Sequence, residues 1–166
     1  MKEIKLTQGQ VALIDDDDFD YLNQWSWYAS KHRNSFRAMR KDIGGKTIFM
    51  HRVIMNTPLD LQVDHKDHDT LNNQKFNLRN CTSSQNQQNR TSKYGSFIYK
   101  GVFWYKRDRK WAARIKVKDK YGWESRIHLG HFKNEKDAAL AYNIVAIKYH
   151  GEFAYLNQIG GLNEQA

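Results

Sequence analysis

The stretch from Val63 to Arg79, VDHKDHDTLNNQKFNLR, gathers acids, imidazoles and amides into one short segment of a basic chain. Three carboxylates and two imidazoles fall within six positions: Asp64, His65, Asp67, His68 and Asp69. Two interpretations are open: a polar turn that is rich in such residues, or a site that holds a metal ion. An Asp-His pair by itself more often belongs to a surface turn, so the choice between the two interpretations depends on the surrounding elements.

The elements around this stretch are predicted to follow the order strand, loop, strand, helix. Residues 63–65 are typical of the end of a short strand, 66–76 of a polar loop, and 77–81 of a second short strand. A helix is expected next, because Thr82, Ser83 or Ser84 can accept hydrogen bonds from its first amides. This order places Asn86 on the first or second turn of the helix.

Four of these side chains suit the hydrolysis of a phosphodiester, which needs a base to activate water and a cation to stabilise the leaving oxygen. The carboxylate of Asp64 is a hard ligand for magnesium or manganese, and the amide oxygen of Asn86 can be a second one. The imidazole of His65 is a suitable base near pH 7 if an asparagine, such as Asn77, orients it. Asp64 and His65 converge on one phosphate only if their strand ends there.

Together with IFMHRVIMN (48–56), the segment VDHKDHDTLNNQKFNLRNCTSSQNQQNR (63–90) resembles HNH endonucleases of the ββα-metal type, especially phage homing endonucleases. The resemblance spans most of residues 1–90. It implies that His65 is the general base, that Asn77 positions it, and that Asp64 and Asn86 bind a single divalent ion, magnesium or manganese. Asn86 stands where many members have histidine, which leaves the preferred metal open.

Three arginines near this site, Arg52, Arg79 and Arg90, are predicted to contact DNA phosphates, with structural or surface roles as the alternative. His51 is expected to be structural or to contact phosphate. Asp67, His68 and Asp69 are interpreted as solvated turn residues. The single cysteine, Cys81, is expected to be a small, partly buried apolar residue.

The N-terminal 50 residues are predicted to form short strands and one helix. The acids that precede Phe19 in DDDDFDYLNQW (15–25) are expected to cap that helix, and a metal site made from Asp15–Asp18 is the rival. A hairpin is predicted to turn at Gly44-Gly45 and to end in IFMHRVIM (48–55).

Residues 98–105, 110–117 and 123–130 alternate in polarity and are predicted to form three strands, followed by a helix over 134–149. In the second strand the apolar positions from Trp111 to Val117 share one face, while Arg114 and Lys116 share the other. The helix has an expected apolar stripe of Ala138, Ala141, Tyr142, Val145 and Tyr149. One face of the sheet is therefore expected to be covered and the other wet and basic.

The charge distribution favours a polyanionic partner. The net charge is +9 and the sequence pI is about 9.6. Residues 98–133 contain eleven Lys or Arg and three Asp or Glu, a net charge of +8. No apolar run approaches the ~20 residues that span a bilayer. We therefore expect an intracellular protein, from a phage or its bacterial host, that binds double-stranded DNA and no membrane.

Residues 94–157 resemble the plant ethylene-response-factor (Apetala-type) DNA-binding domain, through YKGV (99–102), KWAARI (110–115), LGHF (129–132), AALAY (138–142) and LN (156–157). The resemblance implies that a three-stranded sheet enters the major groove. The positions predicted to contact DNA are Lys100, Trp104, Arg114, Lys116, Arg126 and His128. Arg114 and Phe103 differ from the usual plant residues, so the base preference cannot be carried over. The alternative is a merely solvated cationic face.

The sequence thus predicts an α+β protein with a ββα-metal nuclease core and N-terminal strands, followed by a three-stranded antiparallel sheet packed on one helix. The predicted parts are a nuclease domain at 1–90, a linker at 91–97, a DNA-binding domain at 98–157 and a tail at 158–166. The predicted function is that of a site-specific DNA endonuclease, of the homing type, acting as a monomer or a dimer. The alternatives are a DNA-binding regulator with an inactive nuclease half and a non-specific phage nicking nuclease.

Overall fold

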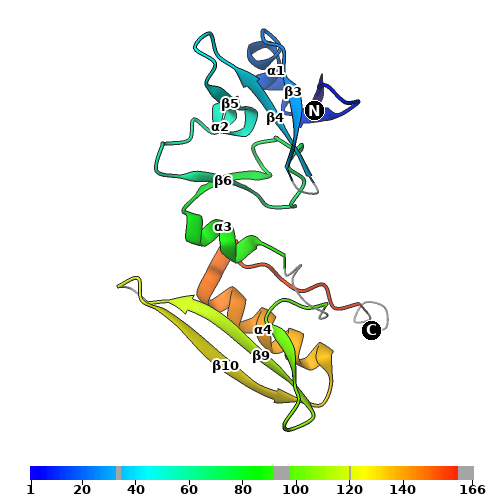
Figure 1. The fold of residues 1–166 in the computed structure, drawn as a ribbon, viewed down its shortest axis with the longest axis vertical. Coiled ribbons are helices and arrows are strands. Elements are labelled where there is room, and N and C mark those ends of the chain that lie inside the picture. Colours follow the sequence, from blue (N-terminus) through cyan, green and yellow to red (C-terminus); the bar gives the residue numbers. More distant parts are fainter. Residues whose placement is uncertain (33–34, 92–97, 120, 161–166) are drawn as a thin grey trace. The chain divides into compact units, whose positions relative to one another are not determined.

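Strands β6 (Gln62–His65) and β7 (Leu78–Cys81) form an antiparallel hairpin, and helix α3 (Ser83–Asn89) follows directly, in the predicted order (Figure 1). Thr82 begins the helix, as expected. Its Oγ1 accepts a hydrogen bond from the amide of Gln85, and Gln85 Oε1 accepts one from the amide of Thr82. This reciprocal pair satisfies amides that an isolated helix start would leave without partners.

The computed structural model describes residues 1–32, 35–91, 98–119 and 121–160. The chain divides into two units, Met1–Gln87 and Gln88–Ala166. The predicted linker at 91–97 and the end of the predicted tail lie largely outside the described residues. None of the described helices has both the length and the hydropathy that crossing a lipid bilayer would require.

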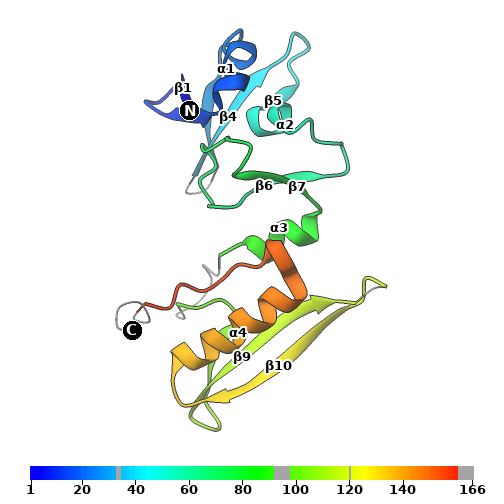
Figure 2. The ribbon, with the colours of Figure 1, turned by 180° about the vertical axis from the view of Figure 1, so that it is seen from behind.

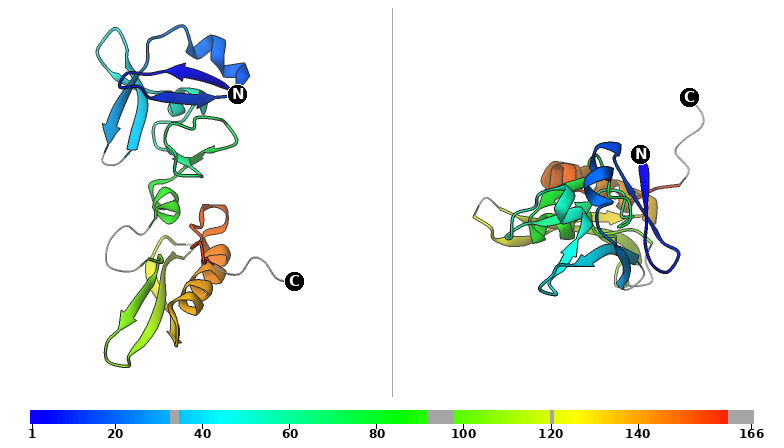
Figure 3. Two further views of the ribbon diagram at one scale, coloured as in Figure 1. Left: turned by 90° about the vertical axis from the view of Figure 1, so that its right-hand side faces the viewer. Right: turned by 90° about the horizontal axis from the view of Figure 1, so that it is seen from above.

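Besides the β6–β7 hairpin, the first unit contains short strands and two small helices. In chain order these are β1 (Lys2–Lys5), β2 (Val11–Ile14), α1 (Asp16–Leu22), β3 (Tyr28–His32), β4 (Ser35–Lys41), β5 (Thr47–Phe49) and α2 (Met50–Ile54). β1 and β2 form one hairpin, drawn in dark blue in Figure 3, and β3, β4 and β5 form a sheet in that order. Their shared core contains Ile4, Ala12, Ile14, Leu22, Trp27, Ala38 and Met50.

The loop between β6 and β7 is attached to this scaffold by backbone hydrogen bonds. The amide of Leu13 donates to the carbonyl of Leu71, and the amide of Asn73 donates to the carbonyl of Leu13. The carboxylate of Asp15 accepts hydrogen bonds from the Lys75 amide and the Gln74 side chain. A loop of this length, rich in Asp and Asn, is therefore held in one conformation by strand β2 and the start of α1.

Two predictions for the N-terminal part are wrong in detail. Residues Met50–Ile54 form helix α2 and not the end of a strand, because Met50, Val53 and Ile54 follow helical spacing and Met50 enters the core. Asp15 occupies the N-cap position of α1 but makes no side-chain cap bond there, because its carboxylate holds the Gln74–Lys75 segment instead.

The second unit is a three-stranded antiparallel sheet of β8 (Val102–Tyr105), β9 (Lys110–Lys118) and β10 (Glu124–Phe132), in the order β10-β9-β8. Helix α4 (Glu135–His150) crosses one face of it, as Figure 2 shows from behind, and a short 3₁₀ helix, η1 (Gly151–Phe153), follows. The predicted α+β class, with this sheet packed on one helix, is confirmed.

The alternation predicted for the middle strand is also confirmed. Ala113, Ile115 and Val117 are buried beneath α4, whereas Arg114 and Lys116 are exposed on the other face. This pattern explains why the strand pairs with two neighbours and still presents a polar surface.

Helix α4 begins at the predicted cap, where the Oδ1 atom of Asn134 accepts a hydrogen bond from the amide of Asp137. Its buried face is rotated from the predicted one: it contains Ala138, Ala139, Tyr142, Ala146 and His150. Tyr149 is exposed, contrary to prediction. The ring of His150 occupies the last buried turn and hydrogen-bonds to the carbonyl of Lys116.

Gly101 and Asn157 lie where the two ends of the second unit meet. A Cβ atom at Gly101, whose φ is +78°, would lie 2.2 Å from the Tyr142 ring and 2.7 Å from the carbonyl of Arg114. The side chain of Asn157 pairs with both the amide and the carbonyl of Lys100. Asn143 of α4 pairs in the same manner with the backbone of Asn157. These bonds attach the C-terminal segment to the beginning of the sheet.

Candidate active site

The carboxylate of Asp64 forms a buried ion pair with Arg79, its direct partner across the hairpin. Arg79 Nε and Nη2 lie 2.9 and 2.6 Å from Asp64 Oδ2. Only 5% of the surface of Asp64 is exposed, so its charge requires a cation. Arg79, predicted to contact DNA phosphate, therefore neutralises the predicted metal-binding carboxylate in this structure.

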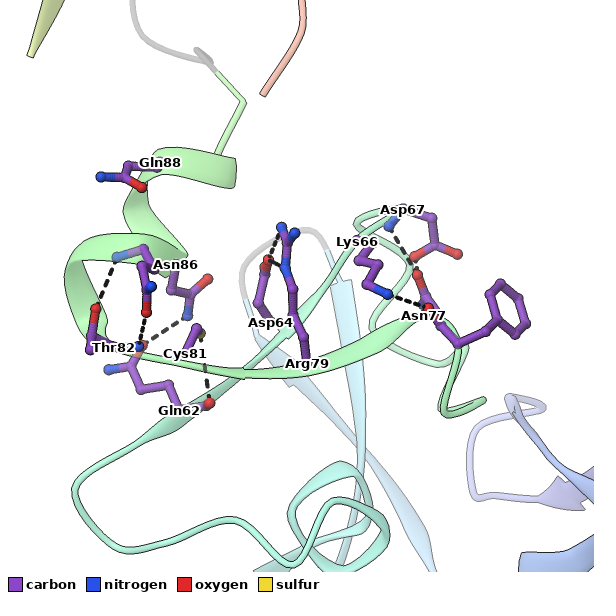
Figure 4. Close-up of polar contacts among 12 residues, drawn as sticks. Gln62, Asp64, Lys66, Asp67, Asn77, Arg79, Cys81, Thr82, Asn86 and Gln88 are labelled. Atoms are coloured by element: carbon purple, nitrogen blue, oxygen red, sulfur yellow. Dashed lines mark hydrogen bonds and ion pairs between the residues drawn. The ribbon is translucent and has the colours of Figure 1, made fainter. Parts of the chain in front are cut away.

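Asn86 lies on the same face of the hairpin as Asp64. Gln62 and Asp64 are two residues apart on β6 and project to one side. The Nδ2 atom of Asn86 donates to Gln62 Oε1 at 2.8 Å, which attaches the first turns of α3 to that side. Figure 4 shows the Asp64–Arg79 pair beside the end of α3 that carries Asn86. The two predicted metal ligands thus share one surface, although they are 22 positions apart in the sequence.

Cys81 lies on this face as well, opposite Gln62, and its thiol contacts the carbonyl of that residue. Burial raises the pKa of Cys81 to about 11, and the charge of Asp64 adds to the rise. The thiol is therefore buried and protonated, as the expected apolar role requires.

His65 is the last residue of β6, which meets the condition that the strand ends at the Asp-His pair. Its Nε2 atom lies 3.3 Å from Oδ1 of Asn73, whose Nδ2 atom donates to the carbonyl of Leu71. An amide oxygen only accepts, so Nε2 carries the ring proton and Nδ1 carries the lone pair. Asn73, which the sequence did not single out, therefore fixes the tautomer of His65 that has its proton on Nε2.

A second imidazole supports the first. The ring of His51, on α2, meets the ring of His65 edge to face with centroids 5.3 Å apart and stacks on Phe49. Burial lowers the pKa of His51 to about 3, with smaller contributions from the charges of His65, Arg37 and Arg52. Burial also lowers the pKa of His65, partly offset by its bond to Asn73 and by Asp67 and Asp64. Both rings are neutral at pH 7.

Asn77 organises the loop that follows His65. Its Nδ2 atom donates to Asp67 Oδ1 and to the carbonyl of Asn72, and its Oδ1 atom accepts from the amide of Asp67. Asp67 in turn accepts from the amide of Asp69 and the side chain of Asn72. Asp67 is exposed, as predicted, but it also joins the two ends of the loop. The direct positioning of His65 by Asn77 stays a prediction.

Two other predicted DNA-binding cations, Arg52 and Lys100, donate hydrogen bonds to carbonyl oxygens. The guanidinium of Arg52 donates to the carbonyls of Thr57, Pro58 and Leu61. Lys100 Nζ donates to the carbonyls of Gln88 and Arg90, and burial lowers its pKa to about 8. The side chain of Arg90 is exposed. These contacts favour structural roles for Arg52 and Lys100.

In the second unit, Arg114, Lys116, Arg126 and His128 lie on the face that α4 leaves uncovered. The register pairs Arg126 with Lys116 and His128 with Arg114, so the four form a block on β9 and β10. Trp104 does not belong to it, because the register places it opposite Trp111, and the two rings meet edge to face. Phe103 occupies the uncovered face instead, beneath the guanidinium of Arg114 at 4.8 Å.

Sequence reasoning missed two further residues of this face, Tyr105 and His131, whose rings stack with centroids 5.0 Å apart. A register shift between His128 and Gly130 brings His131 to the same side as His128. The φ of Gly130, +118°, is the local signal of this bulge. A strict alternation over residues 123–130 could not reveal it.

The donor set suits a hard divalent cation. Asp64 and Asn86 offer one carboxylate and one amide oxygen on a common face, and magnesium is often held by one or two such groups plus water and substrate phosphate. Among the described residues, no three His, Cys, Asp or Glu side chains gather to hold an ion by themselves. Water and phosphate oxygens would complete the coordination.

Strands β6 and β7 and helix α3 thus present hard oxygen donors beside a neutral imidazole, in the order of elements predicted for a ββα-type nuclease. The chain is 30% identical, over 156 residues, to an uncharacterized HNH endonuclease of Acanthamoeba polyphaga mimivirus, a match that covers 92% of this chain and 77% of the viral protein. The chain therefore belongs to the HNH endonuclease family. No family model matches its sequence.

Proposed function

We propose that the chain is a site-specific DNA endonuclease of the homing type. It hydrolyses a phosphodiester bond with His65 as the general base and with one divalent ion, magnesium or manganese, bound at Asp64 and Asn86. The observation that carries the proposal is the shared face of Asp64 and Asn86, with His65 adjacent at the strand end. The scissile phosphate would lie at the His65 end of β6, where side chains from both faces of the β6–β7 hairpin can contact it.

The proposed roles follow from the contacts of each side chain. The Nδ1 atom of His65 accepts a proton from the attacking water, while the Nε2–H bond to Asn73 keeps the ring oriented. The nearby charges of Asp67 and Asp64 favour the protonated ring that results. A divalent ion, when bound, stabilises negative charge on the leaving oxygen. Arg79 would then exchange its partner, Asp64, for phosphate or solvent.

The second unit is proposed to hold the enzyme on its DNA site. Its uncovered face contains Arg114, Lys116, Arg126 and His128, with Phe103 and Tyr105 on the neighbouring strand. Cations beside aromatic rings suit contacts to phosphates and base edges. This arrangement favours a sequence-selective enzyme over a non-specific nicking nuclease.

The test is the nicking of a supercoiled plasmid in magnesium, with EDTA as the control, by the full chain and by His65→Ala. We expect His65→Ala to lower the nicking rate by about 100-fold to 10,000-fold, as the loss of a general base does, and to leave DNA affinity in EDTA unchanged. His32→Ala, at the exposed end of β3, is the matched control. Full activity of His65→Ala would refute the assignment, and metal-independent binding without any nicking would favour the inactive regulator.

A further inference from the structure

Arg37, on β4, lies on the strand face that is continued by Phe49, His51 and His65. Arg37 and Met39 project to the same face of β4, and Met39 is paired with Phe49 of β5. The Phe49 ring stacks on His51 with centroids 5.4 Å apart, and His51 contacts His65. The face of β4 that carries Arg37 therefore leads to His65.

A second contact links this strand to the active-site loop. The hydroxyl of Thr70, between His65 and Asn77, donates to the carbonyl of Phe36, the residue before Arg37. The charge of Arg37 is also one of the causes that lower the pKa of both His51 and His65. The strand contact and the electrostatic coupling both place Arg37 in the neighbourhood of His51 and His65.

The guanidinium of Arg37 has no partner of its own in residues 1–32, 35–91, 98–119 and 121–160: no hydrogen bond, ion pair or aromatic ring engages it there. Burial is the one cause that lowers the pKa of Arg37, so no neighbouring carboxylate offsets its desolvation. Its neighbours in the unit differ: Arg79 pairs with Asp64, Arg52 with three carbonyls, and Arg40 with two tryptophan rings. A partly buried cation without an anion is costly, and such groups occur where a ligand supplies the anion.

We propose that Arg37 is a catalytic residue that binds a non-bridging oxygen of the scissile phosphate on the His65 side of the hairpin. The inference rests on the proposed function. A guanidinium matches the geometry of a phosphate and stays charged at every working pH. Negative charge grows on the phosphate oxygens as water attacks, so Arg37 binds the transition state more strongly than the intact diester.

The experiment compares Arg37→Met, Arg37→Lys and the control Lys31→Met, all in the full chain. Lys31 is an exposed cation on β3, opposite Phe36, so its replacement removes the same charge one strand away. Three quantities are measured: the single-turnover nicking rate of a plasmid at saturating enzyme in magnesium, the DNA affinity in EDTA, and the melting temperature.

We expect Arg37→Met to lower the nicking rate about 100-fold, as loss of one oxyanion donor does, with Arg37→Lys intermediate and Lys31→Met unchanged. Its DNA affinity should fall no more than that of Lys31→Met. Its melting temperature should be equal to or higher than that of the natural sequence, because an unpaired, partly buried charge is removed.

Each other outcome overturns the inference. A lower melting temperature with a proportional loss of activity would make Arg37 a structural residue. Weaker DNA binding with an unchanged rate at saturation would place its contact on the DNA backbone away from the cut bond. Equal nicking rates for Arg37→Met and the natural sequence would show that Arg37 takes no part in catalysis. Absence of nicking by the natural sequence would instead refute the proposed function itself.

Discussion

The imidazole of His51 is held neutral inside the first unit, stacked on Phe49 and touching His65. Its pKa is lowered to about 3, first by burial, whereas the unfolded chain has the ordinary value near 6.5. Below pH 6.5 the unfolded chain therefore binds a proton that the folded protein does not. The contribution of His51 to the free energy of unfolding is fully present above pH 6.5 and is lost as the pH falls from 6.5 towards 3.

Acidification from pH 7 to pH 5 should lower the free energy of unfolding of the first unit by about 2 kcal/mol through His51. His51→Phe, which keeps the stacked ring, should reduce this slope. The remaining slope has the same sign because burial also lowers the pKa of His65. Native-state hydrogen exchange of amides in the core of the first unit would measure the change. An equal slope in His51→Phe, or a loss of slope in the control His32→Phe, would contradict it.

The sequence predicted the residue types of the site better than their contacts. Asp64, His65 and Asn86 could be proposed from the sequence because their positions on β6 and α3 limit where their side chains can point. Asn73 and Arg37 were not, because their proximity to His65 depends on how the loop attaches to β2 and β4. Such contacts between distant segments leave no local periodicity in the sequence.

At the scale of elements, alternation in the second unit was easier to predict than the short N-terminal pieces. Nine residues of β9 are enough to separate a covered from an uncovered face. Five residues of α2 are too few for the helical period to differ clearly from a strand pattern. The register shift before Gly130 and the exposed position of Tyr149 likewise depend on packing between elements and not on local pattern.

Gly101 permits the close approach of β8 to α4, which yields a prediction at this scale. Gly101→Ala should lower the free energy of unfolding of the second unit by about 3–5 kcal/mol, from a strained positive φ and a collision with Tyr142. Gly122→Ala is the matched control: its φ is +86°, but nothing lies within 4 Å of a Cβ there. It should cost only about 1–2 kcal/mol. Urea unfolding would measure both, and equal losses would show that the Tyr142 contact is unimportant.

At the scale of the whole molecule, the charge is concentrated away from the proposed chemistry. Residues 98–133 have a net charge of +8, whereas the Asp64–His65 site lies in the first unit. Binding that neutralises phosphates releases counterions, so affinity should fall steeply as salt is added. The proposed division assigns affinity mainly to the second unit and bond cleavage to the first.

The double variant Arg114→Ala, Lys116→Ala tests this division. The slope of log affinity against log salt should decrease in magnitude by about 2, or roughly 0.9 for each lost phosphate contact. The single-turnover nicking rate at saturating enzyme should not change. Lys136→Ala, Lys148→Ala is the control, since both are exposed cations of α4, the helix that covers the opposite face. An equal decrease of the salt slope in both double variants would show that the sheet attracts DNA only through its overall charge and makes no specific phosphate contacts.

Cys81 gives the molecule an internal reporter. It is the one cysteine of the chain, it is buried on the strand that faces Asp64, and its thiol is protonated at neutral pH. An alkylating reagent such as iodoacetamide can therefore modify the chain at sulfur only when the β6–β7 hairpin opens to solvent. The rate of alkylation therefore reports how often the hairpin opens, without any engineered label. A ligand that stabilises the closed hairpin should lower this rate.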